Sequence, residues 1–368
     1  MFSEQDHRWM SRALQLAKRG LYTTDPNPRV GCVVVKNEKL VGEGWHQRAG
    51  QHHAEVIAIQ EAGSSAEGAT AYVTLEPCSH FGKTPPCAQA LVKAGVNRVV
   101  IAMQDPNPLV SGSGIAQLGE ADVLVSTGLH EQEAELLNKG FCKRMRSGLP
   151  WIMSKLAVSI DGRTSLLNGD SKWITGSAAR QDVHSLRAGS SALMSATGTV
   201  LADNPQLTAR LDNVSTEIIQ PIRVILDSSL NLDPDRKVFN LPGRVILFTL
   251  NTDLAKHQPF IDRKITVCVT QSDEKGRVDL SAVFLQLADF EINEVMIEAG
   301  PTLNGRLLEL GLVDEWIVYQ AGVVLGDQAH GMFNLPTMQT VRQGPRMKLE
   351  DVRKVGEDLR LHYSQIKE

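Results

Sequence analysis

Four residues constrain the fold of this chain more than any other feature: His53, Glu55, Cys78 and Cys87. His53 and Glu55 belong to a His-Ala-Glu segment, and each cysteine follows a proline. One imidazole and two thiolates are three suitable zinc ligands, and this set leaves the fourth coordination position open. Structural zinc sites normally have four Cys or His ligands, so the set predicts a hydrolytic site. Glu55 adds a carboxylate that does not bind the metal and can carry a proton.

Apolar periodicity predicts strands alternating with helices around these four residues, which is typical of an α/β layer. His53 and Glu55 start a predicted helix, Cys78 follows a predicted strand, and Cys87 begins the next helix, where the pKa of a thiol is lowered. Helices are expected over residues 6–19, 53–62, 87–93 and 131–143. Strands are expected over residues 30–35, 40–45, 70–75 and 98–103.

With 368 residues the chain is too long for one ordinary domain. The basic segment 144–150, which contains Gly and Pro, places the boundary between domains 1–147 and 148–368. The second domain is also expected to be α/β, with a helix over 177–188 and a strand-to-helix turn at Gly300–Gly305. Its strands are expected over residues 151–156, 192–195, 222–226, 244–249, 265–269, 294–298 and 315–320.

Composition excludes several classes of protein. The net charge of −4 and the pI near 6.2 argue against non-specific nucleic-acid binding. No secretory signal is expected at the acidic N-terminal segment, and no run of about 18 apolar residues predicts a membrane span. The five cysteines form no short-spaced disulfide framework. We therefore expect a cytoplasmic protein with reduced cysteines and with neither a nucleic-acid nor a membrane partner.

A His-x-Glu segment followed by Pro-Cys and a second Cys is a signature of zinc-dependent deaminases. Zinc held by His53, Cys78 and Cys87 would activate a water molecule for attack on the amidine-like carbon of an aminopyrimidine. Glu55 would take the proton of the water, protonate a ring nitrogen and then protonate the departing ammonia.

Four segments make the chain resemble the deaminases of riboflavin biosynthesis: Asn27–Gly31, His53–Val56, Glu76–Cys87 and Gln104–Pro108. Eight residues separate the two cysteines, as in that family, whereas nucleic-acid and nucleoside deaminases usually have two or three. The resemblance implies that Asn27 orients the pyrimidine, Lys83 binds a phosphate, and Asp105 and Asn107 contact the ribose. Lysine is a point charge suited to phosphate. His46 and His80 are near the site in sequence and are equally compatible with a structural role.

The second domain carries weaker signals of its own. Arg187 and Arg210 can clamp a phosphate, and the turn at Gly300 offers backbone N–H groups at a helix N-terminus, which suit an anion or a dinucleotide. These residues alone indicate only an α/β ligand-binding domain.

Over its whole length the chain resembles the bifunctional riboflavin-biosynthesis proteins, which join a deaminase to a reductase. The resemblance implies a cytidine-deaminase-like α/β/α domain with one zinc ion, followed by a dihydrofolate-reductase-like α/β domain that uses NADPH. The residues implied to contact the reductase substrate are Ser171, Arg187, Leu207, Arg210 and Glu298. Those implied to contact NADPH are Ala157, Trp173, Thr199, Asp203, Gly300, Pro301, Thr302, Leu303, Asn304, Gly305 and Arg306. Asp203 is also a candidate proton donor.

The expected function is a two-step conversion of a small phosphorylated pyrimidine by a homo-oligomer. The first domain would remove the 2-amino group of 2,5-diamino-6-ribosylamino-4(3H)-pyrimidinone 5′-phosphate, and the second would reduce its ribosyl group to ribityl. One alternative is an RNA or nucleoside deaminase with an accessory domain, which the acidic pI and the long loop between the cysteines oppose. The other is a deaminase whose second domain only binds a ligand or drives oligomerisation.

Overall fold

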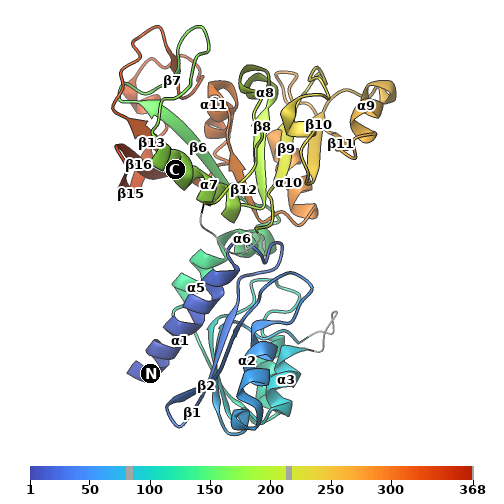
Figure 1. Ribbon diagram of the computed structural model, residues 1–368, viewed down its shortest axis with the longest axis vertical. Coiled ribbons are helices and arrows are strands. Elements are labelled where there is room, and N and C mark those ends of the chain that lie inside the picture. Colours follow the sequence, from blue (N-terminus) through green and yellow to red (C-terminus); the bar gives the residue numbers. More distant parts are fainter. Residues whose placement is uncertain (80–85, 213–217, 367–368) are drawn as a thin grey trace. The chain divides into compact units, whose positions relative to one another are not determined.

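The computed structural model describes residues 1–79, 86–212 and 218–366 and divides into two compact units, Met1–Gly148 and Leu149–Glu368 (Figure 1). The expected boundary, after residue 147, falls beside this division. The five cysteines are free. Over the part of the chain that is described, no helix is both long and apolar enough to cross a membrane.

The first unit is an α/β layer built on one mixed sheet, which confirms the expected fold class. The sheet has the order β2-β1-β3-β4-β5, in which β1 is antiparallel to β2 and β3, and β3, β4 and β5 are parallel. Its strands are β1 (Gly31–Lys36), β2 (Lys39–Trp45), β3 (Thr70–Leu75), β4 (Arg98–Met103) and β5 (Leu124–Thr127). Its helices are α1 (Glu4–Ala17), α2 (Ala54–Ala62), α3 (Cys87–Lys93), α4 (Ser113–Glu120), α5 (Glu131–Leu137) and α6 (Lys139–Ser147), with short 3-10 turns at Lys18–Gly20 and Gly63–Ala66.

Glycines let two helices approach the sheet closely. A Cβ atom at Gly42 would lie 2.2 Å from the carbonyl oxygen of Ala58, and one at Gly44 would lie 2.5 Å from that of Ala54. Helix α2 therefore packs with its backbone against β2. A Cβ at Gly31 would lie 2.0 Å from the carbonyl oxygen of Ala13, so α1 packs equally closely on β1. The contact between Gly44 and Ala54 fixes the first turn of α2, whose N-cap residue is His53.

One predicted helix of the first unit is divided in the structure. A single helix over 131–143 was predicted, but the structure has α5 and α6, which meet at Asn138. The Asn138 side chain accepts the backbone N–H of Arg29 at 2.7 Å and donates to the carbonyl of Arg29 at 3.0 Å. This buried pairing with a distant segment holds Asn138 outside helical geometry, at φ −117° and ψ 24°. Helix α4 and strand β5 were not predicted either.

The second unit contains one long, largely parallel sheet in the order β11-β10-β9-β8-β12-β6-β13-β16-β15, and β7 pairs separately with β14. Its strands are β6 (Trp151–Ser159), β7 (Arg163–Ser165), β8 (Ala192–Ala196), β9 (Ile222–Leu226), β10 (Val245–Thr249), β11 (Thr266–Val269), β12 (Glu294–Ile297), β13 (Glu315–Ala321), β14 (His330–Gly331), β15 (Met347–Val355) and β16 (Asp358–Gln365). Its helices are α7 (Ser177–Gly189), α8 (Thr197–Asp203), α9 (Leu254–Ile261), α10 (Leu280–Asp289) and α11 (Pro301–Glu309), with 3-10 turns at Lys237–Phe239 and Val341–Gln343.

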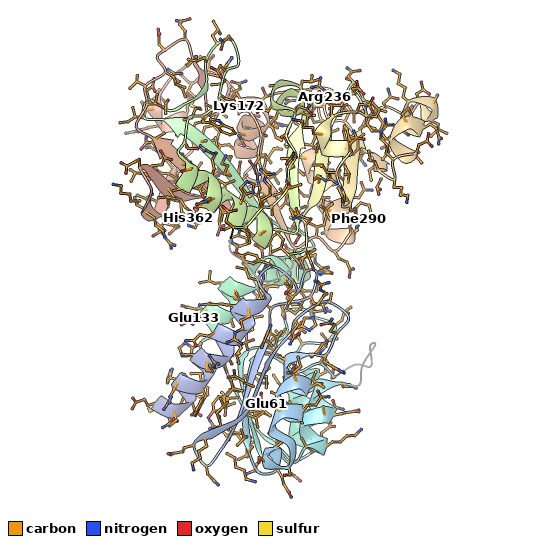
Figure 2. The ribbon with its side chains drawn as sticks, in the orientation of Figure 1. Glu61, Glu133, Lys172, Arg236, Phe290 and His362 are labelled. Carbon is orange, nitrogen blue, oxygen red and sulfur yellow. The ribbon has the colours of Figure 1, made fainter. Side chains whose placement is uncertain are left out.

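Apolar cores cover both faces of this sheet, as parallel sheets require. Val295 and Ile297 of β12 join one core with residues of α10 and α11, and the intervening Met296 joins the other with Val183 of α7. The antiparallel strands β16 and β15 were not predicted, and in the edge strand β15 most side chains are exposed, so it has no continuous buried face. Figure 2 shows the side chains of both units. Glu61 lies near the end of α2 in the first unit, and Lys172 lies in the segment before α7 in the second.

Candidate active sites

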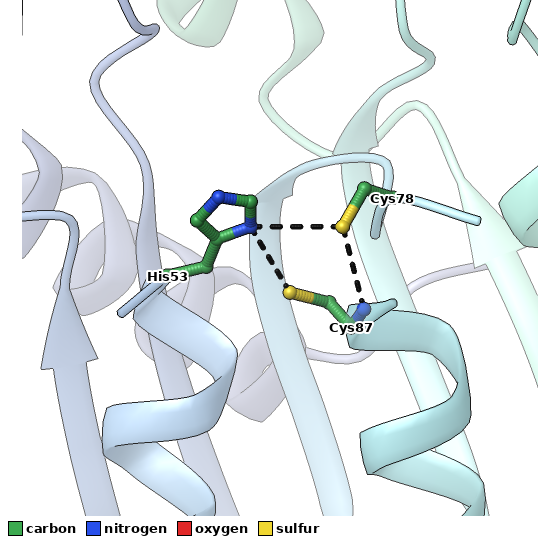
Figure 3. Close-up of side chains that lie close together, drawn as sticks. All are labelled: His53, Cys78 and Cys87. Atoms are coloured by element: carbon green, nitrogen blue, oxygen red, sulfur yellow. Dashed lines mark hydrogen bonds between the residues drawn. The ribbon is translucent and has the colours of Figure 1, made fainter. Parts of the chain in front are cut away.

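His53, Cys78 and Cys87 meet at one point of the first unit (Figure 3). The Nδ1 atom of His53 lies 3.2 Å from Cys87 Sγ and 3.6 Å from Cys78 Sγ. His53 precedes α2, Cys78 lies after β3, and Cys87 opens α3. The three predicted ligands therefore come together from three elements. Among the described residues this is the cluster of His, Cys and carboxylate groups that can hold a metal ion.

The cluster fits a zinc ion. A tetrahedral ion with bonds of about 2.0 Å to nitrogen and 2.3 Å to sulfur keeps its ligand atoms about 3.6 Å apart. The separations from His53 Nδ1 are close to that value. The backbone N–H of Cys87 also donates to Cys78 Sγ at 3.3 Å, which stabilises a thiolate there.

The electrostatics of the cluster favour a charged thiol at Cys78. Its hydrogen bond with Cys87 is the main cause that lowers the pKa of Cys78 to about 4, against the opposing effect of burial, and His53 and the backbone N–H of Cys87 lower it further. The hydrogen bond to Cys78 in turn raises the pKa of His53. Two soft ligands and an imidazole are thus held where a cation would neutralise the thiolate.

Glu55 lies beside the cluster and is only 3 % exposed. Its Oε2 atom is buried without a hydrogen-bond partner among the described residues. Burial is the main cause that raises the pKa of Glu55 to about 7. A buried oxygen left without a partner is costly, so it marks a place where another polar group belongs. A zinc site with an open position for water supplies such a group.

Asn27 reaches the zinc cluster through His46. The Nδ2 atom of Asn27 lies 3.0 Å from His46 Nε2, and His46 Nδ1 lies 3.1 Å from the carbonyl oxygen of His52. The rings of His46 and His53 meet edge to face, with centroids 5.4 Å apart. His46 is buried, and burial is the main cause that lowers its pKa. It therefore connects the predicted pyrimidine contact with a predicted metal ligand.

Asp105 and Asn107 lie in the segment after β4, at the sheet edge where Cys78 follows β3. Asp105 Oδ1 accepts the backbone N–H of Asn107 at 2.9 Å, and Asn107 Oδ1 accepts that of Leu109 at 3.1 Å. The two side chains thus order their own segment. Lys83 and His80 lie outside the described residues.

The second unit has a cavity of about 1160 Å³ at the carboxyl ends of its parallel strands. In open α/β sheets ligands bind in this position. All five predicted substrate contacts line it: Ser171, Arg187, Leu207, Arg210 and Glu298. Of the predicted cofactor contacts, those that line it are Ala157, Trp173, Thr199, Asp203, Gly300, Pro301, Thr302, Leu303 and Arg306. Gly300 is the N-cap residue of α11, so the first turn of this helix faces the cavity.

Asn304 and Gly305 do not line the cavity. Asn304 accepts the hydroxyl of Ser154 at 2.7 Å and donates to the carbonyl of Ala299 at 2.8 Å. A Cβ at Gly305 would lie 2.1 Å from the carbonyl oxygen of Asn334, so this glycine permits close packing of α11. The positions of both residues are explained by packing, and their predicted contact with a cofactor stays a prediction.

Charged side chains are paired on one wall of the cavity. Arg187 donates to both carboxylate oxygens of Glu298, and Lys155 Nζ lies 3.9 Å from the same carboxylate. Burial would raise the pKa of Glu298, but the Arg187 charge and hydrogen bonds outweigh it and lower the pKa to about 2. Burial also lowers the pKa of Lys155. The wall therefore holds a fixed carboxylate between two cations.

Arg210 contributes an exposed cation to the cavity. Its Nη1 atom donates to Gln206 and to Thr208, each at 2.7 Å, and its backbone N–H donates to His184 Nδ1 at 3.2 Å. Burial is the main cause that lowers the pKa of His184 to about 4, and the charges of Arg187 and Arg210 add to it. A neutral His184 that accepts from the backbone thus holds the Arg210 segment in place.

Several cavity residues were missed in the sequence. They are Lys155, Arg180, His184, Thr197, Ser228 and Arg277. Lys155 could have been found from the sequence, since a lysine inside the apolar strand β6 is unusual unless it is paired. Ser228 follows β9 by two residues, but a single serine after a strand has no distinctive pattern.

Two family models match the chain. The cytidine and deoxycytidylate deaminase zinc-binding region matches residues 3–103, and the RibD C-terminal domain matches residues 150–361. The riboflavin biosynthesis protein RibD of Escherichia coli strain K12 is 48 % identical over 367 residues, which are 97 % of this chain and 99 % of that protein. The chain belongs to the RibD family.

Solved structures of RibD proteins agree with this membership. Acinetobacter baumannii RibD, form 1, superposes with a TM-score of 0.93 at 46 % identity, and the match covers 99 % of both chains. A Thermotoga maritima protein described as a diaminohydroxyphosphoribosylaminopyrimidine deaminase and 5-amino-6-(5-phosphoribosylamino)uracil reductase superposes with a TM-score of 0.86 at 33 % identity, over 98 % of this chain and 99 % of its own. The chain is thus a bifunctional deaminase and reductase of riboflavin biosynthesis, with zinc and NADPH as its cofactors.

Proposed function

We propose that the first unit removes the 2-amino group of 2,5-diamino-6-ribosylamino-4(3H)-pyrimidinone 5′-phosphate and that the second unit then reduces the ribosyl group of the product to ribityl. The observation that carries the first step is the meeting of His53, Cys78 and Cys87 beside the buried carboxylate of Glu55. The cavity with the Arg187–Glu298 pair supports the second step. Membership of the RibD family disfavours a second unit that only binds a ligand.

His53, Cys78 and Cys87 would hold the zinc ion, which would supply the Lewis acid that activates water for attack on the amino-bearing carbon. Glu55 would take one proton of the water and give it to a ring nitrogen, and would then carry the second proton, from the hydroxyl formed at that carbon, to the amino group that leaves as ammonia. Its unpartnered Oε2 and its burial suit this task, because no neighbour among the described residues competes for that oxygen.

The remaining deaminase residues bind the substrate. Asn27, held by His46, orients the pyrimidine, while Asp105 and Asn107 contact the ribose. Lys83, which lies outside the described residues, binds the phosphate, a role that the family resemblance implies.

In the second unit Ser171, Arg187, Leu207, Arg210 and Glu298 contact the substrate, and Arg187 also holds the carboxylate of Glu298 in place. NADPH, when bound, supplies the hydride that reduces C1 of the ring-opened or imine form of the ribosyl group. The residues that hold it and line the cavity are Ala157, Trp173, Thr199, Asp203, Gly300, Pro301, Thr302, Leu303 and Arg306. Arg180 lies over the ring of the exposed Trp173 at 4.7 Å, which steadies that side chain for contact with a planar ligand.

Two assays on one preparation test both steps. Ammonia release from the diaminopyrimidine substrate and NADPH oxidation in the presence of the deaminated product are both expected. A flat NADPH trace with folded protein would overturn the assigned reductase function. The expectations of a homo-oligomer and of no nucleic-acid partner stay predictions, which light scattering and a filter-binding assay with RNA would check.

A further inference from the structure

Glu76 connects the two sides of the proposed deaminase site. It follows β3 directly, is 5 % exposed, and lies two residues before Cys78. Both oxygens of its carboxylate accept backbone N–H groups from the segment after β4. Oε2 accepts from Asp105 at 3.1 Å and Gly112 at 3.0 Å, and Oε1 accepts from Gly114 at 2.9 Å and Ile115 at 3.3 Å.

Two glycines allow this close approach. A Cβ at Gly114 would lie 2.0 Å from the carbonyl oxygen of Pro77, so any larger residue would push the segment away from Glu76. Gly112 has φ +82°, in the left-handed region that glycine adopts without strain. Gly114 and Ile115 belong to the first turn of α4, whose unpaired N–H groups favour a negative charge. Glu76 therefore supplies a cap for α4 from another element.

The same carboxylate fixes the start of the segment. The Asp105 N–H is bound to Glu76, and Asp105 then orders Asn107 through the bond from the Asn107 N–H. The backbone N–H of Glu76 donates to the carbonyl of Met103 at 3.0 Å, so the ends of β3 and β4 are held together as well. Cys78 is thus connected to Asp105 by the short stretch of backbone from Glu76 to Cys78 and by the side chain of Glu76.

We infer that Glu76 is a positioning residue of the deaminase step, which holds the segment 105–115 in place relative to the zinc ligand Cys78. This inference rests on the proposed ribose contacts of Asp105 and Asn107. A neutral amide cannot replace the carboxylate, because its NH₂ group would face N–H donors where an acceptor is required. The segment would then move, and the binding of the ribose would weaken.

The test is Glu76→Gln in the full chain. We expect zinc content and NADPH oxidation to equal those of the wild type, while the KM of ammonia release rises about 10- to 100-fold and kcat falls less. Hydrogen exchange of the amides of Asp105, Gly112 and Gly114 should become faster. The matched control is Glu61→Gln on α2, since this exposed carboxylate accepts one backbone N–H, that of Glu43, and should leave every readout unchanged.

Other outcomes separate the inference from its rivals. Loss of zinc with a proportional fall in kcat and an unchanged KM would overturn it in favour of support for the metal site. Unchanged KM and unchanged exchange would also overturn it. If Glu76→Gln does not fold, Gly114→Ala provides the second variant, because its Cβ displaces the same segment and should raise KM while zinc is retained. Faster exchange in a protein whose wild type releases no ammonia would uphold the anchoring contact and reject the proposed function instead.

Discussion

Arg187 and Glu298 form a doubly hydrogen-bonded ion pair on the wall of the cavity, with distances of 2.5 Å from Nε and 2.9 Å from Nη2. They lie 111 positions apart in the chain, on α7 and directly after β12. The Nη1 atom of Arg187 also donates to the carbonyl of Thr208 at 3.1 Å. Much of the guanidinium is therefore occupied, and Arg187 fixes the orientation of Glu298 more directly than it can clamp a phosphate.

Replacing Arg187 by Met should destabilise the second unit strongly. The substitution leaves the largely enclosed Glu298 carboxylate, whose side chain is 13 % exposed, without its main partner. Such a loss in a buried pair costs about 3 to 5 kcal/mol of the free energy of unfolding, and we expect a value at the lower end. Urea denaturation of the full chain measures it. The double variant Arg187→Met/Glu298→Leu should regain part of that loss, because the Glu298 charge is gone, although Lys155 then loses its carboxylate partner. Both variants should lose NADPH oxidation, so recovered stability without recovered activity separates the two roles.

Replacing Glu55 by Gln should abolish ammonia release and leave NADPH oxidation intact. The amide keeps the size of the side chain but cannot take a proton, and loss of a general acid–base group typically lowers kcat about 10²- to 10⁴-fold. Zinc content should not change, since Glu55 is not among the clustered ligands. Loss of both activities together would argue against two independent sites.

Removal of zinc should have the same selectivity. The purified protein should contain about one zinc ion per chain, held by three ligands. A strong chelator should stop ammonia release, and added zinc should restore it. NADPH oxidation with the deaminated product should continue throughout, because none of the three zinc ligands lines the cavity of the second unit. Ammonia release by protein free of zinc would contradict the metal assignment.

The zinc cluster was predictable from the sequence because each ligand lies in a short segment with its own pattern. His53 and Glu55 are two residues apart, and each cysteine follows a proline. Strands β1, β3 and β4 were predictable because every one is a buried apolar run.

Contacts between distant segments explain what could not be predicted. The pairing of Asn138 with Arg29 breaks a helix that periodicity alone would continue. The role of Glu76 could not be predicted from its place before Pro-Cys, because the backbone N–H groups that it accepts are 29 to 39 positions away. Strand β15 could not be predicted from apolar periodicity, because it is held by hydrogen bonds to β16 and its side chains remain largely exposed.

The first unit should lose stability in acid through Asp6. Burial would raise the pKa of this carboxyl, but hydrogen bonds from Arg98, Ser3 and Tyr72 outweigh it and hold the pKa well below its ordinary value of 3.8. The stabilisation is therefore complete above the unfolded-state pKa and is lost as the pH falls below it toward the folded-state value. In urea denaturation, Asp6→Asn should be less stable than the wild type at pH 7, and the difference should shrink toward pH 3. A difference that stays constant between these pH values would exclude Asp6 as the titrating group.

Arg210 offers the sharpest test of the second cavity, because it is an exposed cation that lines the wall. A charge-assisted hydrogen bond to a phosphate contributes about 1.5 to 3 kcal/mol, so Arg210→Ala should raise the KM for the deaminated substrate roughly 10- to 100-fold. The phosphate is remote from the reacting carbon and is bound equally in the ground and transition states, so kcat should change little. The matched control is Arg353→Ala on β15, which removes an exposed cation paired with Asp351 and lies outside the cavity lining. A fall in kcat at constant KM would instead place Arg210 at the reacting end of the substrate. An unchanged KM for NADPH in both variants would assign the loss to the substrate and not to the cofactor.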